Sequence, residues 1–307
     1  MIKIYYKTLK SKGLEEIKES KIGSWIYIEN PTDMEMDRLA SQFNLEKDLL
    51  NDALDPYEVP RIEQEGGVAY VFTRVPFQDN NRVVTAPVLI GIGPSFVFTV
   101  SKEPLPFLNK FINSAVDFST TQKNKLFLQI FSQINSVYSN FIMTMSRQVR
   151  AMSGKLENVN NKTIIKFVTF EEILNDFLAA LIPTNSILKD LLLGKTIKLY
   201  EEDEDLVEDM LHANGQLAEL TKSNLKTIVN IREAYSTIMT NNLNRIIKFL
   251  TVLTIVLNIP MIIASFYGMN VSLPIEKTPG AFWWILIFTV TISVILLGIF
   301  NKKRWLE

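Results

Sequence analysis

The distribution of charged and apolar residues divides the chain into two different parts. Near the C-terminal end, residues 249–275 and 278–301 contain no charged side chain. A helix needs about 20 apolar residues to cross a bilayer core, and both runs are long enough. The pattern predicts two membrane spans, at about 249–268 and 281–301, joined by a loop over 268–280. Two buried helices of a soluble core are the alternative, but uncharged runs of this length are rare there.

A long amphipathic pattern leads into the first span without interruption. Its apolar residues step by four and three, close to the 3.5-residue period of helices packed along a seam: Leu206, Met210, Ala213, Leu217 and Leu220. From residue 201 onward no proline occurs until Pro260, so we expect one helix over 202–265, roughly 95 Å long at 1.5 Å per residue. A seam needs partner helices, and two spans per chain are too few to enclose a pore. The pattern therefore predicts an oligomer without giving its number.

The first hundred residues show the mixed pattern of an α/β domain. Apolar segments predict strands, of which the last two form a hairpin, at residues 2–6, 25–28, 67–76, 82–92 and 95–100. One helix is expected from a cap at Thr32 or Asp33 to about Phe43. A short second helix is expected over 45–54, where the Asp55-Pro56 step ends it.

From about residue 121 onward the spacing of apolar residues is helical. A further helix is predicted over 163–193, interrupted near Pro183 and stopped by Gly194. We therefore expect an α+β membrane protein with three parts, namely a cytosolic α/β domain at 1–120, a helical region with the long stalk helix at 121–248, and a transmembrane hairpin at 249–307.

Basic residues gather on one side of the predicted membrane. Five of them lie just before the first span or just after the second: Arg245, Lys248, Lys302, Lys303 and Arg304. The connecting loop has Lys277 beside Glu276. The positive-inside rule places both termini in the cytoplasm and the loop outside. Because the N-terminus shows no apolar signal region, we assign the protein to the plasma membrane with its first 248 residues in the cytosol.

Composition narrows the possible chemistry. The 307 residues include 32 Lys+Arg and 33 Asp+Glu, for a formal net charge of −1, so the basic excess of a nucleic-acid-binding protein is missing. The chain has no cysteine, and His212 is its one histidine. Disulfides, thiolate catalysis and zinc sites built on cysteine are excluded. We find no nucleophile–base pair and no phosphate-binding loop, so an enzyme is the least favoured class.

The end of the first span carries a resemblance to a known family. The sequence reads Tyr267-Gly268-Met269-Asn270, after a charge-free span and before a short loop, a second span and a basic tail. With the small α/β domain and the long helix, this arrangement resembles the CorA family of magnesium channels over essentially the whole chain. The resemblance implies a homopentamer in the lipid bilayer, in which the first span lines a central pore. It also implies that Gly268, Met269 and Asn270 form the selectivity filter.

Asn270 suits a filter for a hydrated ion. Mg²⁺ prefers octahedral oxygen coordination and loses its water reluctantly. A ring of Asn270 amide oxygens can accept hydrogen bonds from the water bound to the ion. Gly268 permits a tight turn at the helix end, and Met269 is expected to pack against the loop. A helix C-cap is the alternative role of Asn270.

The lower part of the first span offers further pore residues. Helical spacing places four of them on one face, which matches the pore-lining face of the family: Asn244, Ile247, Leu250 and Asn258. Ile247 and Leu250 would form an apolar gate that closes by dewetting, and Asn244 a polar ring at the cytosolic neck. Asn258 fits either the pore or a hydrogen bond to a neighbouring helix.

Acidic residues supply a candidate regulatory site for Mg²⁺. Asp209, on the long helix, matches the position from which family members bind regulatory magnesium. Asp52 matches its partner from the next subunit, by its distance from residues 60–63. A cation between the two carboxylates would hold the pore closed, and their repulsion would open it when cytosolic Mg²⁺ falls. Glu276 either attracts cations to the outer mouth or is a solvated loop charge, and His212 is expected to be a surface histidine.

Other functions stay open beside the pentameric Mg²⁺ channel. The same architecture could carry Co²⁺, Ni²⁺ or Zn²⁺, although Met269 favours Mg²⁺ because some zinc-carrying relatives have another residue there. A membrane-anchored sensor would use the hairpin as an anchor. That reading leaves Asn244, Asn258 and Asn270 without a common role.

Overall fold

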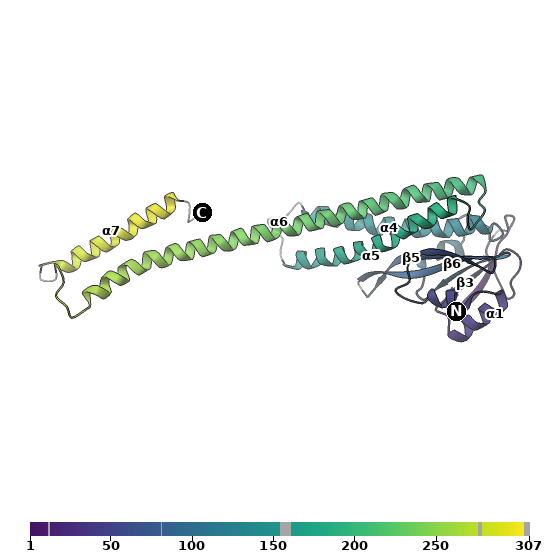
Figure 1. Ribbon diagram of the computed structural model, residues 1–307, viewed down its shortest axis with the longest axis horizontal. Coiled ribbons are helices and arrows are strands. Elements are labelled where there is room, and N and C mark those ends of the chain that lie inside the picture. Colours follow the sequence, from purple (N-terminus) through teal and green to yellow (C-terminus); the bar gives the residue numbers. More distant parts are fainter. Residues whose placement is uncertain (12, 81, 154–160, 276–277, 304–307) are drawn as a thin grey trace. The chain divides into compact units, whose positions relative to one another are not determined.

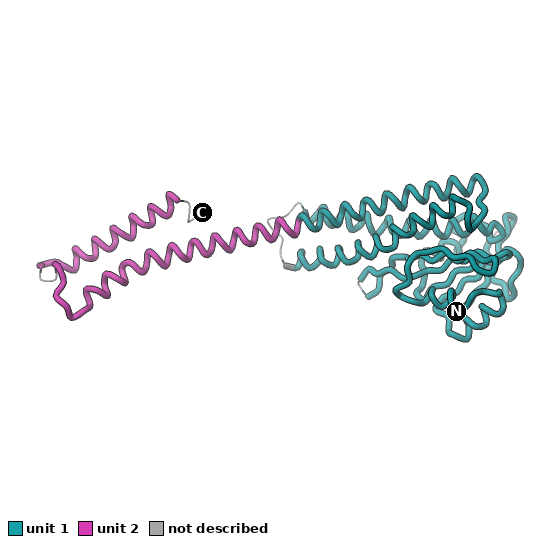
Figure 2. The backbone as a smooth tube through the Cα atoms, in the orientation of Figure 1, with its two compact units in different colours: residues 1–230 teal, residues 231–307 magenta. Residues whose placement is uncertain are grey.

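The computed structural model describes residues 1–11, 13–80, 82–153, 161–275 and 278–303. Its backbone contacts divide the chain into two compact units, Met1–Asn230 (unit 1) and Ile231–Glu307 (unit 2), which Figure 2 shows in different colours. The division into three parts at residues 120 and 248 stays a prediction.

A mixed sheet forms the centre of unit 1 (Figure 1). Its strands are β1 (Ile2–Tyr6), β2 (Glu15–Ile17), β3 (Ser24–Glu29), β4 (Arg61–Glu65), β5 (Val68–Asp79), β6 (Arg82–Ile92) and β7 (Phe96–Ser101). Among the described residues the order is β2-β1-β3-β7-β6-β5-β4, with β3 and β7 parallel and the other neighbours antiparallel. The predicted strands are confirmed. The two strands that were not predicted, β2 and β4, are the edges of the sheet, and their sequences are mostly polar.

Two short helices, α1 (Asp33–Phe43) and α2 (Lys47–Asp52), pack on one face of the sheet. Met36 and Leu50 of these helices join Phe72 of β5 and Phe98 of β7 in one buried cluster. A Cβ atom at Gly91 of β6 would lie 2.0 Å from the Phe98 ring on the neighbouring strand. Glycine at this position therefore lets the ring lie across the strand.

A capping box starts α1 where the sequence predicted it. The backbone N–H of Glu35 donates to the Thr32 hydroxyl, and the Glu35 carboxylate accepts from the Thr32 N–H at 2.8 Å. The hydrogen bond from the Thr32 backbone holds the pKa of Glu35 below its usual value.

The remaining elements of unit 1 are helical. They are the 3-10 turn η1 (Pro106–Leu108), α3 (Asn109–Ile112), α4 (Lys123–Ser153), α5 (Asn161–Leu192) and the first part of α6 (Glu201–Tyr267). The ring of Trp25, on the strand face opposite to Ile26, lies 6.2 Å from the Phe111 ring of α3. Tyr138 of α4 donates its hydroxyl to the carbonyl of Arg74 on β5 at 3.1 Å. The sheet is therefore covered on both faces.

The predicted interruption near Pro183 is wrong, because α5 continues through it. Proline removes one backbone hydrogen bond and clashes with the preceding turn, at a cost of about 3 kcal/mol. Here the residues on both sides are firmly packed, with Leu181 1% and Leu188 0% exposed. This burial offsets the local cost. Gly194 follows the helix end with a φ of 62°, as a predicted stop should.

The amphipathic seam at the start of α6 finds its partner helices within the same chain. Side-chain amides on or facing α6 connect the helices: Asn135 of α4 donates to the Met210 carbonyl at 3.4 Å, and Asn214 donates to the Leu181 carbonyl of α5 at 2.8 Å. Met210 is 3% exposed. Met210 and Leu217 of the seam are buried within the chain, whereas Ala213 is exposed and Leu206 and Leu220 are half-buried, so the predicted oligomer stays a prediction.

Two described helices are long and apolar enough to cross a membrane. These are α6, which continues through Pro260 for 67 residues in all, and α7 (Ala281–Lys302) with 22 residues. In each helix the most apolar window is only 6% buried, whereas a core helix would be mostly buried. The predicted long helix and the two candidate spans are confirmed.

Candidate functional site

The predicted filter residues lie in a turn directly after α6. The N–H of Gly268 donates to the carbonyl of Ala264 at 3.0 Å, so helical hydrogen bonding ends here. Tyr267 donates its hydroxyl to the Pro274 carbonyl at 3.2 Å, which connects the last turn of α6 to the loop. Asn270 is exposed in the single chain, so its amide is accessible to solvent.

Contacts within one chain do not explain the glycine and the methionine of this turn. Gly268 lacks left-handed backbone, and a Cβ atom there would come no closer than 3.4 Å to the Ala264 oxygen. Met269 is 54% exposed and does not pack as expected. The backbone reason that we gave for glycine and the packing that we gave for methionine are therefore absent from the single chain.

The polar side chains of the first span gather on one face of α6. At 100° per residue, four hydroxyl and amide residues fall within an arc of about 60°: Thr251, Thr254, Asn258 and Ser265. The other predicted pore residues widen this arc to about 120°, and all are exposed: Asn244, Ile247 and Leu250. We call these seven residues the polar face. Its threonines and serine were missed, although the helical spacing that selected Asn258 also selects them.

The opposite face of α6 is covered within the chain. Val252 is 1% exposed and Val256 9% exposed, while Ile259 and Ile263 are half-buried. At 100° per residue, these four residues centre about 150° around the helix from the polar face. Farther along, α6 and α7 line a common apolar cavity of about 580 Å³, with Ile263 and Phe288 among its walls. Within unit 2, α6 thus covers one narrow apolar strip and leaves the polar face exposed, together with apolar residues such as Leu257 and Met261.

Two threonines of the polar face donate their hydroxyl protons back to the helix. Thr251 donates to the Ile247 carbonyl and Thr254 to the Leu250 carbonyl, both at 2.8 Å. Each hydroxyl oxygen keeps its lone pairs. These side chains therefore present hydrogen-bond acceptors to whatever lies against the face.

The ends of α7 match the two surfaces of a bilayer. Trp283 and Trp284, in the first turn, are 64% and 66% exposed. Tryptophan is enriched at membrane–water interfaces. Lys302 and Lys303 at the other end are exposed as well. Glu276 lies outside the described residues.

Asp52, the first of the two predicted regulatory carboxylates, is already paired with a cation. It is the last residue of α2, is 43% exposed, and accepts from Nη2 of Arg61 at 2.7 Å through Oδ2. The same guanidinium pairs with the carboxylates of Glu58 and Glu63. Arg61 was missed because β4, on which it lies, was not predicted.

Asp209, the second predicted carboxylate, is exposed on α6. It lines a groove of about 470 Å³ whose α4 wall includes Ser132 and Ser136. His212 is 70% exposed at its side chain, 3.8 Å from Glu208, as a surface histidine would be. In the described part of one chain, no group of three or more His, Cys, Asp or Glu residues could hold a metal ion. The metal site predicted on Asp52 and Asp209 therefore stays a prediction.

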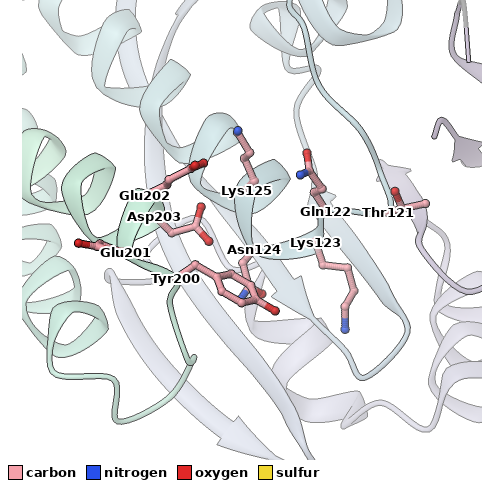
Figure 3. A pocket seen from close by; sticks show the side chains of 9 residues that line it. All are labelled: Thr121, Gln122, Lys123, Asn124, Lys125, Tyr200, Glu201, Glu202 and Asp203. Atoms are coloured by element: carbon pink, nitrogen blue, oxygen red, sulfur yellow. The ribbon is translucent and has the colours of Figure 1, made fainter. Parts of the chain in front are cut away.

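A cavity of about 830 Å³ lies at the first turns of α4 and α6, and Figure 3 shows the side chains that line it. None of the predicted site residues is among them. Its wall holds the buried Asp203, 6% exposed, and the exposed Glu202. It also holds Lys123, which donates to the Gly93 carbonyl at 2.8 Å and whose pKa is lowered by burial. With acids and lysines on the same wall, the cavity indicates no single class of ligand.

The chain is similar to known proteins along almost its whole length. The family described as CorA-like Mg²⁺ transporter protein matches residues 20–304. The cobalt/magnesium transport protein CorA of Methanocaldococcus jannaschii is 24% identical over 290 residues, which span 92% of this chain and 91% of that protein. The complete structure of the CorA magnesium transporter from Methanocaldococcus jannaschii has a TM-score of 0.86 at 22% identity, and the match covers 99% of this chain and 98% of that one. The ZntB cytoplasmic domain from Vibrio parahaemolyticus has a TM-score of 0.64 at 9% identity, covering 78% and 98%. At these identities the structural likeness establishes the fold.

Proposed function

Because this chain belongs to the family of CorA-like Mg²⁺ transporter proteins, we propose that it forms a homopentameric channel that conducts Mg²⁺ into the cell. Proteins of this family are ion transporters, so the prediction of a non-enzymatic function is confirmed. A divalent cation gains about 4–5 kcal/mol per 100 mV of inside-negative potential, which is enough to drive entry without a nucleotide.

The polar face of α6 is the observation that carries the proposal. A side-chain amide such as that of Asn258 in a membrane span faces a cavity or another helix, because contact with lipid leaves its donors and acceptor without partners. The covered residues of α6, around Val252 and Val256, lie about 150° around the helix from the polar face. If several α6 helices form a ring around a central axis, their polar faces contact water in the centre and α7 lies on the outside.

The oligomer follows from the same geometry. One α6 offers a single stripe of polar residues, and two spans cannot surround a water-filled pathway. Several copies must therefore contribute one stripe each. The number five comes from the family resemblance, since the geometry of one chain does not determine it.

Residues 268–270 form the selectivity filter in this proposal. Asn270, exposed in the turn after α6, supplies amide oxygens at the outer mouth. Mg²⁺ keeps several of its water molecules in most protein sites. A ring of amide oxygens holds such an ion through the hydrogens of its water, without the cost of stripping it. Gly268 and Met269 have no role within one chain and would serve contacts between copies.

Ile247 and Leu250 form the gate, with Asn244 below them at the cytosolic neck. Both apolar side chains are exposed in the single chain, at 52% and 59%. Rings of such side chains close a narrow pore by excluding water. Asn258, higher in the span, provides a polar ring between gate and filter.

Asp52 and Asp209 form the regulatory site between neighbouring subunits. Carboxylate oxygens are the ligands that Mg²⁺ prefers, and both side chains are accessible in the single chain. Bound Mg²⁺ supplies the positive charge that lets the two carboxylates face each other. Without it their repulsion loosens the subunit boundary and favours the open state.

The protein lies in the plasma membrane with both termini in the cytoplasm. The basic residues that flank the spans support this orientation, with Lys302 and Lys303 exposed at the end of α7. The loop at 268–280 then faces outward, where Glu276 would attract cations to the mouth.

Transport of Co²⁺ is the second candidate activity, because the relative from Methanocaldococcus jannaschii is named for both cobalt and magnesium. A filter that holds the ion through its water does not discriminate strongly between hydrated divalent cations of similar size. The zinc and nickel alternatives and the anchored sensor are not favoured by any residue described above.

The test is ion uptake into proteoliposomes that hold an inside-negative potential and an internal Mg²⁺-sensitive dye. Wild-type protein and Asn270→Ala are compared, with Co²⁺ as the second ion and Ser272→Ala, also in the outer loop, as the matched control. We expect flux in the wild type and the control and its loss in Asn270→Ala. Assembled wild-type protein that passes neither ion, even without internal Mg²⁺, would contradict the channel and favour the sensor.

A further inference from the structure

Arg61 is the centre of a charge cluster that includes the proposed regulatory ligand Asp52. Its Nη2 atom lies 2.7 Å from Oδ2 of Asp52, while Nη1 pairs with Glu58 and Nε with Glu63. All three nitrogens of one guanidinium are therefore engaged by three different carboxylates. We call these four residues the Arg61 cluster.

The guanidinium is fixed by the sheet beneath it. Arg61 lies opposite Phe72 in the pairing of β4 with β5, and its central carbon is 4.1 Å from the centre of that ring. Phe72 itself is 0% exposed and belongs to the core. On the far side, the backbone carbonyl of Glu58 accepts from Nη1 of Arg74 at 2.6 Å. The position of the positive charge is thus set by residues that cannot move without disturbing the core.

The cluster is only partly neutralised. Three carboxylates share one cation, so its formal charge is −2. The side chain of Glu58 is 11% exposed, whereas those of Asp52 and Glu63 are 43% and 42% exposed. Arg61 engages Asp52 through Oδ2, and the Asp52 side chain is still 43% exposed. A divalent cation that binds Asp52 must therefore sit close to the guanidinium.

We propose that Arg61 is the resident counter-ion of the regulatory site and sets the Mg²⁺ concentration at which that site fills. The inference rests on the proposed role of Asp52. A Mg²⁺ ion on Asp52 lies roughly 5 Å from the guanidinium, because Mg–O bonds are about 2.1 Å. Repulsion at that distance weakens binding roughly tenfold, even at a water-like dielectric constant. The site therefore stays empty at Mg²⁺ concentrations at which Asp52 and Asp209, without the nearby arginine, would already bind the ion.

The test measures the Mg²⁺ dependence of thermal unfolding on the full chain in detergent. A ligand that binds the folded state raises the unfolding midpoint, and the concentration giving half of the rise reports its affinity. Arg61→Gln removes the charge, and Arg61→Lys retains it. We expect Arg61→Gln to lower the half-maximal Mg²⁺ concentration about tenfold, and Arg61→Lys to stay within about twofold of the wild type. A purely structural role of Arg61 would shift the unfolding temperature itself without this change in Mg²⁺ dependence.

Two further variants separate this inference from the regulation on which it rests. Asp52→Asn should abolish the Mg²⁺ effect, and so should Asp52→Asn combined with Arg61→Gln. If Asp52→Asn leaves the effect intact, Asp52 is no ligand and both ideas are overturned. If Asp52→Asn abolishes it while Arg61→Gln leaves the half-maximal concentration unchanged or raises it, only the role of Arg61 is overturned.

A variant on the exposed rim keeps the test decisive if Arg61→Gln fails to fold. Glu63→Gln removes one negative charge from the Arg61 cluster, leaves the guanidinium in place and affects a side chain that is 42% exposed. We expect its half-maximal Mg²⁺ concentration to rise several-fold. An unchanged value would show that the charge of the cluster does not control the site. Glu65→Gln, on the same strand and outside the cluster, is the matched control.

Discussion

Units 1 and 2 differ in what they do with large apolar side chains. Unit 1 buries Trp25, Phe72 and Phe98 almost completely within and around its sheet. In unit 2, apolar side chains such as Leu250 and Trp284 are more than half exposed, and Val252 is one of the few that are covered. Unit 1 completes its core with its own residues in water. Unit 2 leaves its apolar surface to be covered by lipid and, in the proposed channel, by other copies of the chain.

The same contrast occurs within the single helix α6. Before residue 231, buried residues such as Val207 and Met210 recur with helical spacing among exposed ones. Over 249–267, where α6 carries no charged side chain, most residues are exposed. A stripe of apolar residues on a charged helix thus marks packing within the chain, and a long uncharged stretch marks a different solvent. The two parts of α6 differ in the chemistry of their side chains, since the backbone helix itself is continuous.

The largest expected effect compares one phenylalanine from each unit. Phe98→Ala opens a cavity in the core of unit 1 and should lower the free energy of unfolding by about 3–5 kcal/mol. Phe282→Ala, at a site that is 68% exposed, should cost under about 1 kcal/mol in detergent. Urea unfolding followed by circular dichroism measures both. Equal losses would show that unit 2 depends on its own apolar packing as unit 1 does.

The next effect concerns the proposed gate. Leu250→Asn places an amide where an apolar ring should exclude water, so flux at high internal Mg²⁺ should rise roughly tenfold, a change of about 1.4 kcal/mol in the barrier. Leu250→Ile keeps the site apolar and serves as the control. Dye-based uptake with Mg²⁺ inside the vesicles measures the leak. If Leu250→Asn shows no increased Mg²⁺ leak, the gate does not lie at Leu250.

A smaller effect separates the polar face of α6 from its other sides. Thr251→Val combined with Thr254→Val keeps the volume and removes two acceptors, so Mg²⁺ flux should fall roughly fivefold, in line with about 1 kcal/mol for lost hydrogen bonding. Leu253→Val, outside the polar face, should leave flux unchanged. If the control loses as much flux as the threonine pair, the assignment of the pore face is wrong.

The smallest effect is confined to unit 1. Thr32→Ala removes the cap of α1 and should cost about 1 kcal/mol at pH 7. Since the pKa of Glu35 is lowered from 4.5 in the folded state, its contribution is present above pH 4.5 and is lost as the pH falls through the lowered value. The difference between Thr32→Ala and the wild type in thermal unfolding should therefore shrink below pH 4.5. A constant difference would mean that Glu35 takes no part in the cap.

Local patterns predicted the elements that fold by local rules. The spans, the long helix, the inner strands and the cap at Thr32 all follow from spacing, charge and capping chemistry within a short window. The polar edge strands β2 and β4 lack such a pattern, because an edge needs one neighbour and little burial. The helix through Pro183 also escaped prediction, because residues distant in sequence provide the packing that holds it.

The sequence predicted those residues of the candidate site that belong to the family motif or share one face of a single helix. Asn270 and Asn258 stand out because polar residues are rare in a span. Thr251 and Thr254 do not stand out in a list of residues, and emerge when their direction around the helix is compared with that of Val252. The link between Arg61 and Asp52 depends on the pairing of β4 with β5, which the sequence pattern does not show.

The back-bonded threonines of α6 bear on which sign of ion the pathway admits. Their protons are held by the carbonyls of Ile247 and Leu250, so the wall offers lone pairs. A water molecule beside these threonines points its hydrogens at the hydroxyl oxygens and its own oxygen toward the pore axis. That is the orientation of the first shell around a cation and the reverse of the shell around chloride. In the proposed pore, discrimination against anions would therefore begin with the direction of water dipoles, at a depth where the helix carries no charged side chain.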